Sequence, residues 1–238
     1  MSSTKIQIVG SIIKTDGTLT KSGMAADAKA VGDAIIDIEE RLANLSYEAI
    51  EITSFTNNVG TVELGNTVDS VTFEWVMNKA PTTLMLDDNL IDIGLNRYTY
   101  SNLDLYSTSV ATNTYTLKAI DERGYEASKS THINFYNGIY YGVVDNGTAV
   151  NSSTILGLTK KLQNSRSTTF TANAGNDQYV MYSQPSRLGA PSFNVGGFDG
   201  GFHLEKTIKF TNAYGYAENY DIYFSDNLAL GSITVKVS

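Results

Sequence analysis

The sequence contains no cysteine among its 238 residues, and it has only three prolines and two histidines. The absence of cysteine excludes a disulfide scaffold, a thiolate zinc site and a thiol nucleophile, and it fits synthesis in a reducing cytosol. The two histidines, His132 and His203, are far apart in the sequence, so we expect no histidine-based zinc site. Hydroxyl, amide, carboxylate and aromatic groups remain as the available chemistry.

Charge is also scarce, because only 18% of the residues are charged, against roughly 25% in an ordinary soluble domain. The 17 Lys and Arg residues against 25 Asp and Glu residues give a net charge of −8, which argues against a nucleic-acid partner. No apolar run approaches the ~20 residues that span a bilayer, and the first residues lack the pattern of a secretory signal. We therefore expect a soluble protein without membrane insertion.

Catalytic signatures are missing as well. The sequence has no phosphate-binding Gly-Lys-Ser/Thr motif, no dinucleotide fingerprint, and no Ser or Asp constellation around either histidine. Paired carboxylates such as Asp87 and Asp88 occur by chance in any acidic chain and do not indicate a glycosidase. We expect no catalytic residues, no cofactor, no metal site and no enzyme activity, although oxygen ligands for calcium in glycine-rich loops would leave no readable spacing.

One long helical pattern covers residues 24–45, after a predicted strand at residues 5–13, a turn at Asp16-Gly17 and a helix cap at Ser22. Its apolar residues follow a heptad spacing, which keeps the stripe facing a partner helix, and isoleucine at both core positions favours three or more strands. With Gly32 inside it, so short a helix is marginal alone. We predict a homotrimer; the alternative is a helix packed on its own domain. The predicted oligomerisation residues are Ala28, Val31, Ile35, Ile38, Leu42 and Leu45.

From residue 47 the pattern changes to the period of two that is typical of strands. The segment 71–77 places Val71, Phe73, Trp75 and Met77 on one face, and turn signals separate this strand from its neighbours. Short alternating strands of this kind predict an Ig-like β-sandwich over residues 47–137, with Trp75 in its core rather than exposed to stack on sugars. The other predicted strands are 48–55, 83–86, 97–103, 112–120 and 127–135.

Asn137-Gly138 interrupts this pattern and predicts a boundary, with a second β-sandwich over residues 138–238. One helical turn is predicted at 154–162. The fold class is therefore mainly β, with an N-terminal segment 1–46 carrying a short coiled-coil helix, followed by two sandwiches. The predicted strands of the second sandwich are 168–172, 178–182, 192–195, 206–210, 219–224 and 231–237.

Glycine- and asparagine-rich loops at 173–177, 196–202 and 212–216 are the candidate recognition sites, because loops on a rigid sandwich usually carry binding. The run 196–202 predicts a hairpin whose glycines adopt positive φ. Aromatic faces and amide groups suit sugars, and the alternative for each candidate is ordinary packing. The candidate ligand-binding residues are Tyr179, Tyr182, Phe198, Asp199, Tyr214 and Tyr216.

Two stretches resemble the tail and baseplate proteins of tailed bacteriophages or prophages of Gram-positive and gut bacteria. Residues 19–35, continuing into 39–42, are similar to the short oligomerising helix near the start of such proteins, and residues 47–135 resemble the Ig-like modules of virion proteins. The rest of the chain looks like a C-terminal domain that often ends them. The segments that carry this second likeness are 170–172, 182–185, 189–191, 193–198, 210–213 and 220–223.

The resemblance implies a virion structural protein of the distal tail, tail fibre or baseplate, made in the cytoplasm of the host bacterium. Its implied partners are its own copies, other tail proteins and a host-surface glycan bound by the C-terminal domain. The resemblance supplies no catalytic residues. The alternatives are a purely architectural or decoration protein without a ligand, and an enzyme that degrades wall or capsule.

Overall fold

The computed structural model describes residues 15–16, 25–26 and 28–238. The chain forms two compact units, Met1–Ala49 and Ile50–Ser238. In the first unit, β1 (Thr15–Asp16) pairs in parallel with β2 (Ala25–Ala26), and α1 (Ala28–Leu45) follows. The helix thus begins at Ala28 and not at residue 24 as predicted, because Ala25–Ala26 are extended in the pairing with β1. The predicted strand 5–13 and cap Ser22 lie outside the described residues.

The apolar stripe of helix α1 is exposed. Ile35, Ile38, Leu42 and Leu45 are between 50% and 84% exposed, while Val31 is half-buried. Ala28 is the first residue of the helix. Within the described part of the chain, no helix combines the length and the hydrophobicity that a bilayer crossing requires.

The second unit begins with a β-sandwich, which we call the first lobe. Its three-stranded sheet has the order β3-β5-β8, and the facing sheet contains β6, β7, β9, β4 and the first half of β10. The bounds of these strands are β3 (Ile52–Asn57), β4 (Thr61–Glu63), β5 (Thr67–Met77), β6 (Thr83–Leu86), β7 (Asn89–Leu90), β8 (Arg97–Tyr106), β9 (Ala111–Ile120) and β10 (Glu126–Asp145).

The core of the first lobe confirms the alternation in β5. Val71, Phe73 and Trp75 are all buried, and the Trp75 indole N–H donates to the Leu95 carbonyl at 3.1 Å. Phe73 lies 4.8 Å, ring centroid to ring centroid, from Tyr115. Trp75 is therefore a core residue with a satisfied N–H, as its position on the apolar face predicts.

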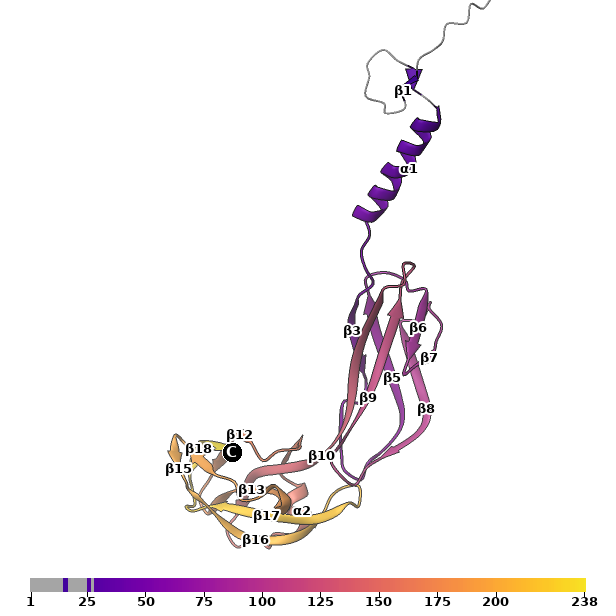
Figure 1. Cartoon of the computed structure of the whole chain (residues 1–238). Helices are drawn as coiled ribbons and strands as arrows, with labels where there is room; N and C mark the ends of the chain where they lie inside the picture. Colours follow the sequence, from indigo (N-terminus) through magenta and orange to yellow (C-terminus); the bar gives the residue numbers. More distant parts are fainter. Residues whose placement is uncertain (1–14, 17–24, 27) are drawn as a thin grey trace, which may run out of the picture. The chain divides into compact units, whose positions relative to one another are not determined.

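The break in the strand pattern predicted at Asn137-Gly138 is wrong, because the 20 residues of β10 run through this dipeptide (Figure 1). Its first half pairs with β9 and its second half with β11 and β13. Gly138 serves close packing and not a turn, since a Cβ there would lie 2.5 Å from Cε2 of Tyr140. Asn137 is buried and hydrogen-bonded. The two sandwiches therefore share one strand.

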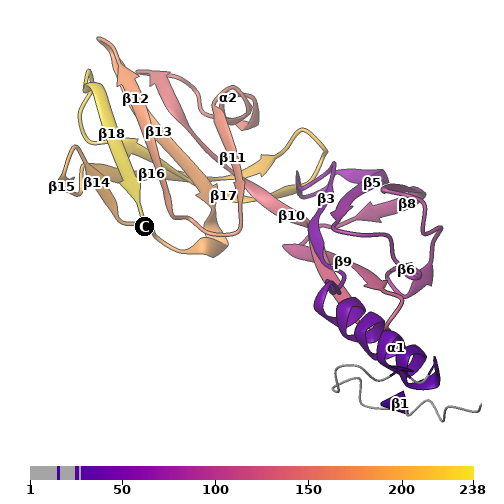
Figure 2. The ribbon, with the colours of Figure 1, turned by 90° about the horizontal axis from the view of Figure 1, so that it is seen from above.

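The second half of β10 begins the sandwich that we call the second lobe. One sheet has the order β16-β17-β13-β10 with β11 beside β10, and the other has the order β12-β18-β14-β15, in which β12 and β18 lie side by side (Figure 2). The bounds of the remaining elements are α2 (Ser152–Leu156), β11 (Thr159–Gln163), β12 (Thr168–Ala174), β13 (Gln178–Pro185), η1 (Ser186–Leu188), β14 (Phe193–Val195), β15 (Phe198–Asp199), β16 (Phe202–Thr211), β17 (Ala217–Ser225) and β18 (Gly231–Val237).

The β13-containing sheet of the second lobe has apolar groups buried on both of its faces. One face packs on the β12-containing sheet around Tyr182, and the other packs around Tyr140 with Ile155 of α2. The helical turn predicted at 154–162 is wrong in its second half, because α2 ends at Leu156 and residues 159–163 form β11. Pairing with the edge of β10 outweighs the local helical preference there.

The junction of the two lobes is a network of buried polar contacts. The Glu63 carboxylate of the first lobe accepts from the Tyr140 hydroxyl at 2.6 Å and from the Lys160 ammonium at 2.7 Å. The Asn212 amide of the second lobe donates to the Leu64 carbonyl at 2.7 Å. Because buried polar groups without partners are costly, separating the lobes would be strongly unfavourable.

A second part of the network surrounds Asn137. Its amide donates to Glu218 at 2.8 Å, and the Arg187 guanidinium contacts both Glu218 and the Asn137 side chain. Burial raises the pKa of Glu218 above its ordinary value, and Arg187 offsets this effect only in part. The Tyr220 hydroxyl donates to the Gly138 carbonyl at 2.8 Å.

We predict that Gly138→Ala destabilises the second unit by about 1–3 kcal/mol, because the added methyl group meets the buried Tyr140 ring. Gly142→Ala is the matched control in the same strand, since the nearest atom to its Cβ would be Cδ2 of Leu158, the flexible end of a side chain, at 3.0 Å. Urea denaturation followed by the fluorescence of the single tryptophan measures both. Equal stability of the two variants would contradict the packing role of Gly138.

We predict that stability falls as the pH rises above about 10, the ordinary pKa of tyrosine. Burial raises the pKa of Tyr140, Tyr182 and Tyr220 well above that value in the folded state. Their stabilising contribution is therefore complete below the unfolded pKa and is lost as the pH rises through the folded one. Tyrosinate absorbance should increase together with loss of β-sheet circular dichroism, and Tyr220→Phe should make the pH dependence shallower. Gradual ionisation without unfolding would refute this.

Candidate functional site

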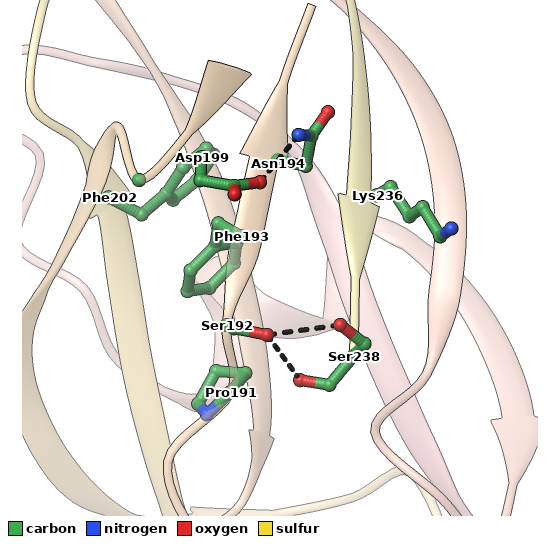
Figure 3. Close-up of a pocket in the computed structure, with 9 residues that line it drawn as sticks. Pro191, Ser192, Phe193, Asn194, Asp199, Phe202, Lys236 and Ser238 are labelled. Atoms are coloured by element: carbon green, nitrogen blue, oxygen red, sulfur yellow. Dashed lines mark hydrogen bonds between the residues drawn. The ribbon is translucent and has the colours of Figure 1, made fainter. Parts of the chain in front are cut away.

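The glycine-rich segment of the second lobe borders a surface hollow of about 580 Å³ (Figure 3). The hollow is formed where β14 and β15 meet the end of β18 and the start of β16. Its lining residues are Pro191, Ser192, Phe193, Asn194, Asp199, Gly200, Phe202, Lys236 and Ser238.

Two aromatic rings form the apolar part of the hollow. Phe193 and Phe202 stack with 4.4 Å between ring centroids and 10° between ring planes. Phe193 also packs edge-on against Tyr182, at 5.6 Å between centroids. The core of the lobe therefore holds this aromatic floor in place.

A row of polar side chains crosses the strands on the other face of the same sheet, because Asn194 follows Phe193 in β14 and successive residues of a strand point to opposite faces. Lys236 of β18 lies opposite Asn194 of β14, and Asn194 lies opposite Asp199 of β15. The Asn194 amide donates to the Asp199 carboxylate at 2.7 Å (Figure 3). Thr169 of β12 continues the row beyond Lys236. An ammonium, a carboxamide and a carboxylate thus share one face, which gives both donors and acceptors.

The β14–β15 hairpin confirms the prediction of positive-φ glycines. Gly196 and Gly197 before Phe198 have φ of 58° and 97°, and Gly200 and Gly201 after Asp199 have φ of 101° and 83°. These values lie in the region that glycine adopts without strain. The Asn194 side-chain oxygen Oδ1 also accepts from the Gly197 backbone N–H at 3.1 Å. The two hydrogen bonds of the Asn194 side chain therefore hold the hairpin in place, and the Phe198 side chain on it is 81% exposed.

The candidate residues do not gather at one place. Asp199 lines the hollow and Phe198 lies beside it in β15. Tyr179 lines a separate hollow of about 300 Å³. Tyr182 is fully buried, and its hydroxyl donates to the Arg166 carbonyl at 2.9 Å. No face of the Tyr182 ring is left for a ligand, so this residue belongs to the core.

The remaining two candidates lie in the turn between β16 and β17. The buried Asn212 side chain accepts from the backbone amides of Tyr214 and Tyr216 at 2.9 and 3.1 Å. Tyr216 packs against the core of the first lobe. It lies so close to Gly65 that a Cβ added to Gly65 would be 2.6 Å from the Cβ of Tyr216. This loop therefore joins the lobes, and of its two tyrosines Tyr214 is the exposed one, at about half of its surface.

The sequence analysis missed the polar row and the aromatic floor. Alternation in β18 places Thr234 and Lys236 on its outer face, but it does not indicate which strands lie beside them. Asn194 and Phe202 flank the glycine run, and that proximity was the available signal. Among the described residues, no three His, Cys, Asp or Glu side chains form a metal-binding group.

No family model and no curated protein matches the chain. Among solved structures, it is similar to the Streptomyces avermitilis α-L-rhamnosidase complexed with L-rhamnose, with 9% identity and a TM-score of 0.29, over 79% of this chain and 23% of that chain. It is similar to the N-terminal eight Ig domains of Down Syndrome Cell Adhesion Molecule, with 10% identity and a TM-score of 0.24, over 77% of this chain and 23% of that chain.

A carbohydrate-binding module from the β-sandwich superfamily has 12% identity and a TM-score of 0.30, over 80% of this chain and 96% of that chain. The chain spans less than a quarter of the first two proteins. These likenesses concern the β-sandwich fold alone, and the chain is a mainly β protein of two sandwiches preceded by a helix.

Proposed function

We propose that the protein binds a glycan through the β14–β15 hairpin and the adjoining hollow of the second lobe. The observation that carries the proposal is the exposed Phe198 ring on a hairpin fixed by Asn194, at the sheet edge where the polar row ends at Asp199, the next residue of β15. Pyranose rings have an apolar C–H face and a rim of hydroxyl groups, so they match an aromatic face beside donors and acceptors. A hairpin that is ordered before binding loses little entropy on binding.

We further propose, from the sequence resemblance, that this glycan lies on a bacterial surface and that the protein is a virion component of a phage tail. The exposed heptad stripe of α1 supports self-association, because a partner helix would cover apolar area that its own unit leaves in water. A trimer linked through this helix would bring three weak sites together. Their combined binding would exceed that of one site, because later contacts form at high effective concentration.

An architectural spacer without a ligand is the second candidate. The unbroken β10 and the buried contacts of Glu63 favour it, since they suit a part that transmits force between other components. A spacer would copurify with virions but would not bind glycans. The proposal includes no catalysis, so release of reducing ends from a polysaccharide would contradict it.

We predict that Phe198→Ala weakens binding of the full chain to purified wall and capsule polysaccharides at least about tenfold, a loss of 1.4 kcal/mol or more. The exposed ring packs little within the lobe, so stability should not change. Tyr214→Ala is the matched control, because it removes an exposed aromatic ring from another hairpin of the same lobe. Equal loss in both variants, or none in either, would refute the assignment to this hairpin.

We predict that Ile35→Asp converts the trimer into single chains, because a carboxylate in an apolar helix seam is poorly solvated. Ile36→Asp is the control, since Ile36 is exposed to a similar degree, 55% against 50%, but lies off the seam. Light scattering after size exclusion measures the mass of both variants, and of a chain that starts at Tyr47. A wild-type monomer would overturn the trimer.

A further inference from the structure

The second lobe contains another hollow, of about 300 Å³, that lies on the opposite face of the β13-containing sheet. Two adjacent residues of β16 line different hollows, since Phe202 lines the first hollow and His203 lines the second. Successive residues of a strand point to opposite faces of its sheet. The two hollows are therefore separate, and a single sugar ring cannot occupy both.

An aromatic pair forms the floor of this second hollow. Tyr179 of β13 and Phe224 of β17 stack with 5.2 Å between ring centroids and 17° between ring planes. Both rings are half-buried, so part of the pair faces solvent. Their other side joins the core around Tyr140 and Ile155. The floor is therefore a fixed apolar surface.

His203 stands at the rim in a defined orientation. Its Nδ1 lies 2.8 Å from an Asp226 carboxylate oxygen, and its Nε2 lies 3.7 Å from Glu205, beyond hydrogen-bond distance. A carboxylate only accepts, so Nδ1 carries the proton in the contact with Asp226. In the neutral ring, Nε2 then presents a lone pair, and it accepts a hydrogen bond from a hydroxyl group.

The charged groups around this second hollow favour an uncharged ligand. Its lining includes Glu205 and the polar residues Asn146 and Thr148, but no Lys or Arg, and Asp226 stands behind His203. An anionic ligand would meet carboxylates without a compensating cation. The first hollow differs, because Lys236 lies beside it.

We propose that this second hollow is a sugar-binding subsite for an uncharged pyranose that stacks on Tyr179 and donates a hydroxyl hydrogen bond to Nε2 of His203. The inference rests on the proposed glycan binding and deepens it, because it gives each chain two subsites of different charge preference. The first accepts neutral or acidic sugars, and the second accepts neutral sugars. One chain then binds two separate segments of surface glycan.

The two histidines of the sequence allow a direct test in the full chain. With 15N-labelled histidine, the ring resonances of His203 are followed during titration with methyl glycosides of glucose, galactose and N-acetylglucosamine, and with glucuronate. We expect saturable shifts at His203 with at least one neutral glycoside and none with glucuronate. His132, whose Nδ1 lies 3.1 Å from Thr114 in the first lobe, is the internal control and should not shift.

Variants separate this subsite from the first. Tyr179→Ala should weaken the His203 response at least about tenfold, while Tyr179→Phe, which keeps the ring face, should retain it. Unchanged β-sheet circular dichroism and an unchanged midpoint of urea denaturation would show that the variants are folded. No response of His203 to any of the neutral glycosides, or an equal response to glucuronate, overturns the inference.

Phe198→Ala distinguishes failure of the inference from failure of the proposed function. If the second subsite is independent, this variant loses polysaccharide binding at the hairpin but keeps the His203 response. Loss of the response in Phe198→Ala would overturn the second subsite as a separate site. A His203 response in a protein whose polysaccharide binding does not depend on Phe198 would overturn the hairpin proposal and leave the second subsite.

Discussion

The unbroken pairing of β10 is the constraint on which the second unit depends. Its first half completes a sheet of one sandwich and its second half completes a sheet of the other, so neither lobe has a full set of strands without it. The strand also fixes the place of Glu63, Tyr140 and Lys160, because Tyr136 lies opposite Glu63 and Tyr140 lies opposite Lys160. Backbone register thus brings the ionic contacts of the junction together, and those contacts in turn hold the lobes.

The strands were predictable where one face is buried. The bounds predicted for β6 and β18 agree with the structure, because in each strand every second residue is the more deeply buried one. The failures occurred where long-range pairing overrides local signals. Asn137-Gly138 has the composition of a turn but lies inside a strand, since Gly138 accommodates the Tyr140 ring. Residues 159–162 contain no signal that the edge of β10 is available for pairing.

The candidate site was predictable only in part, and for the same reason. The glycine run indicated a hairpin, and its positive φ values follow from the residue type. Lys236 and Asn194 share one polar row only because β14 pairs with β18, a pairing that local sequence does not encode. Tyr182 has the same residue type and similar neighbours as Tyr179, yet it points to the opposite face of β13. The two positions are three residues apart, and this odd number of steps along the strand separates a core ring from one that reaches solvent.

The shared strand also constrains how this gene can vary. A recombination point between residues 137 and 138 would join half of one β10 to half of another, and the pairing of β10 with β4, β9, β11 and β13 would have to match across the new joint. An exchange near residue 50 meets no such demand, because it falls where the two compact units divide. We therefore expect the pair of sandwiches to be exchanged as one piece, with diversity within it arising from point changes and from surface hairpins.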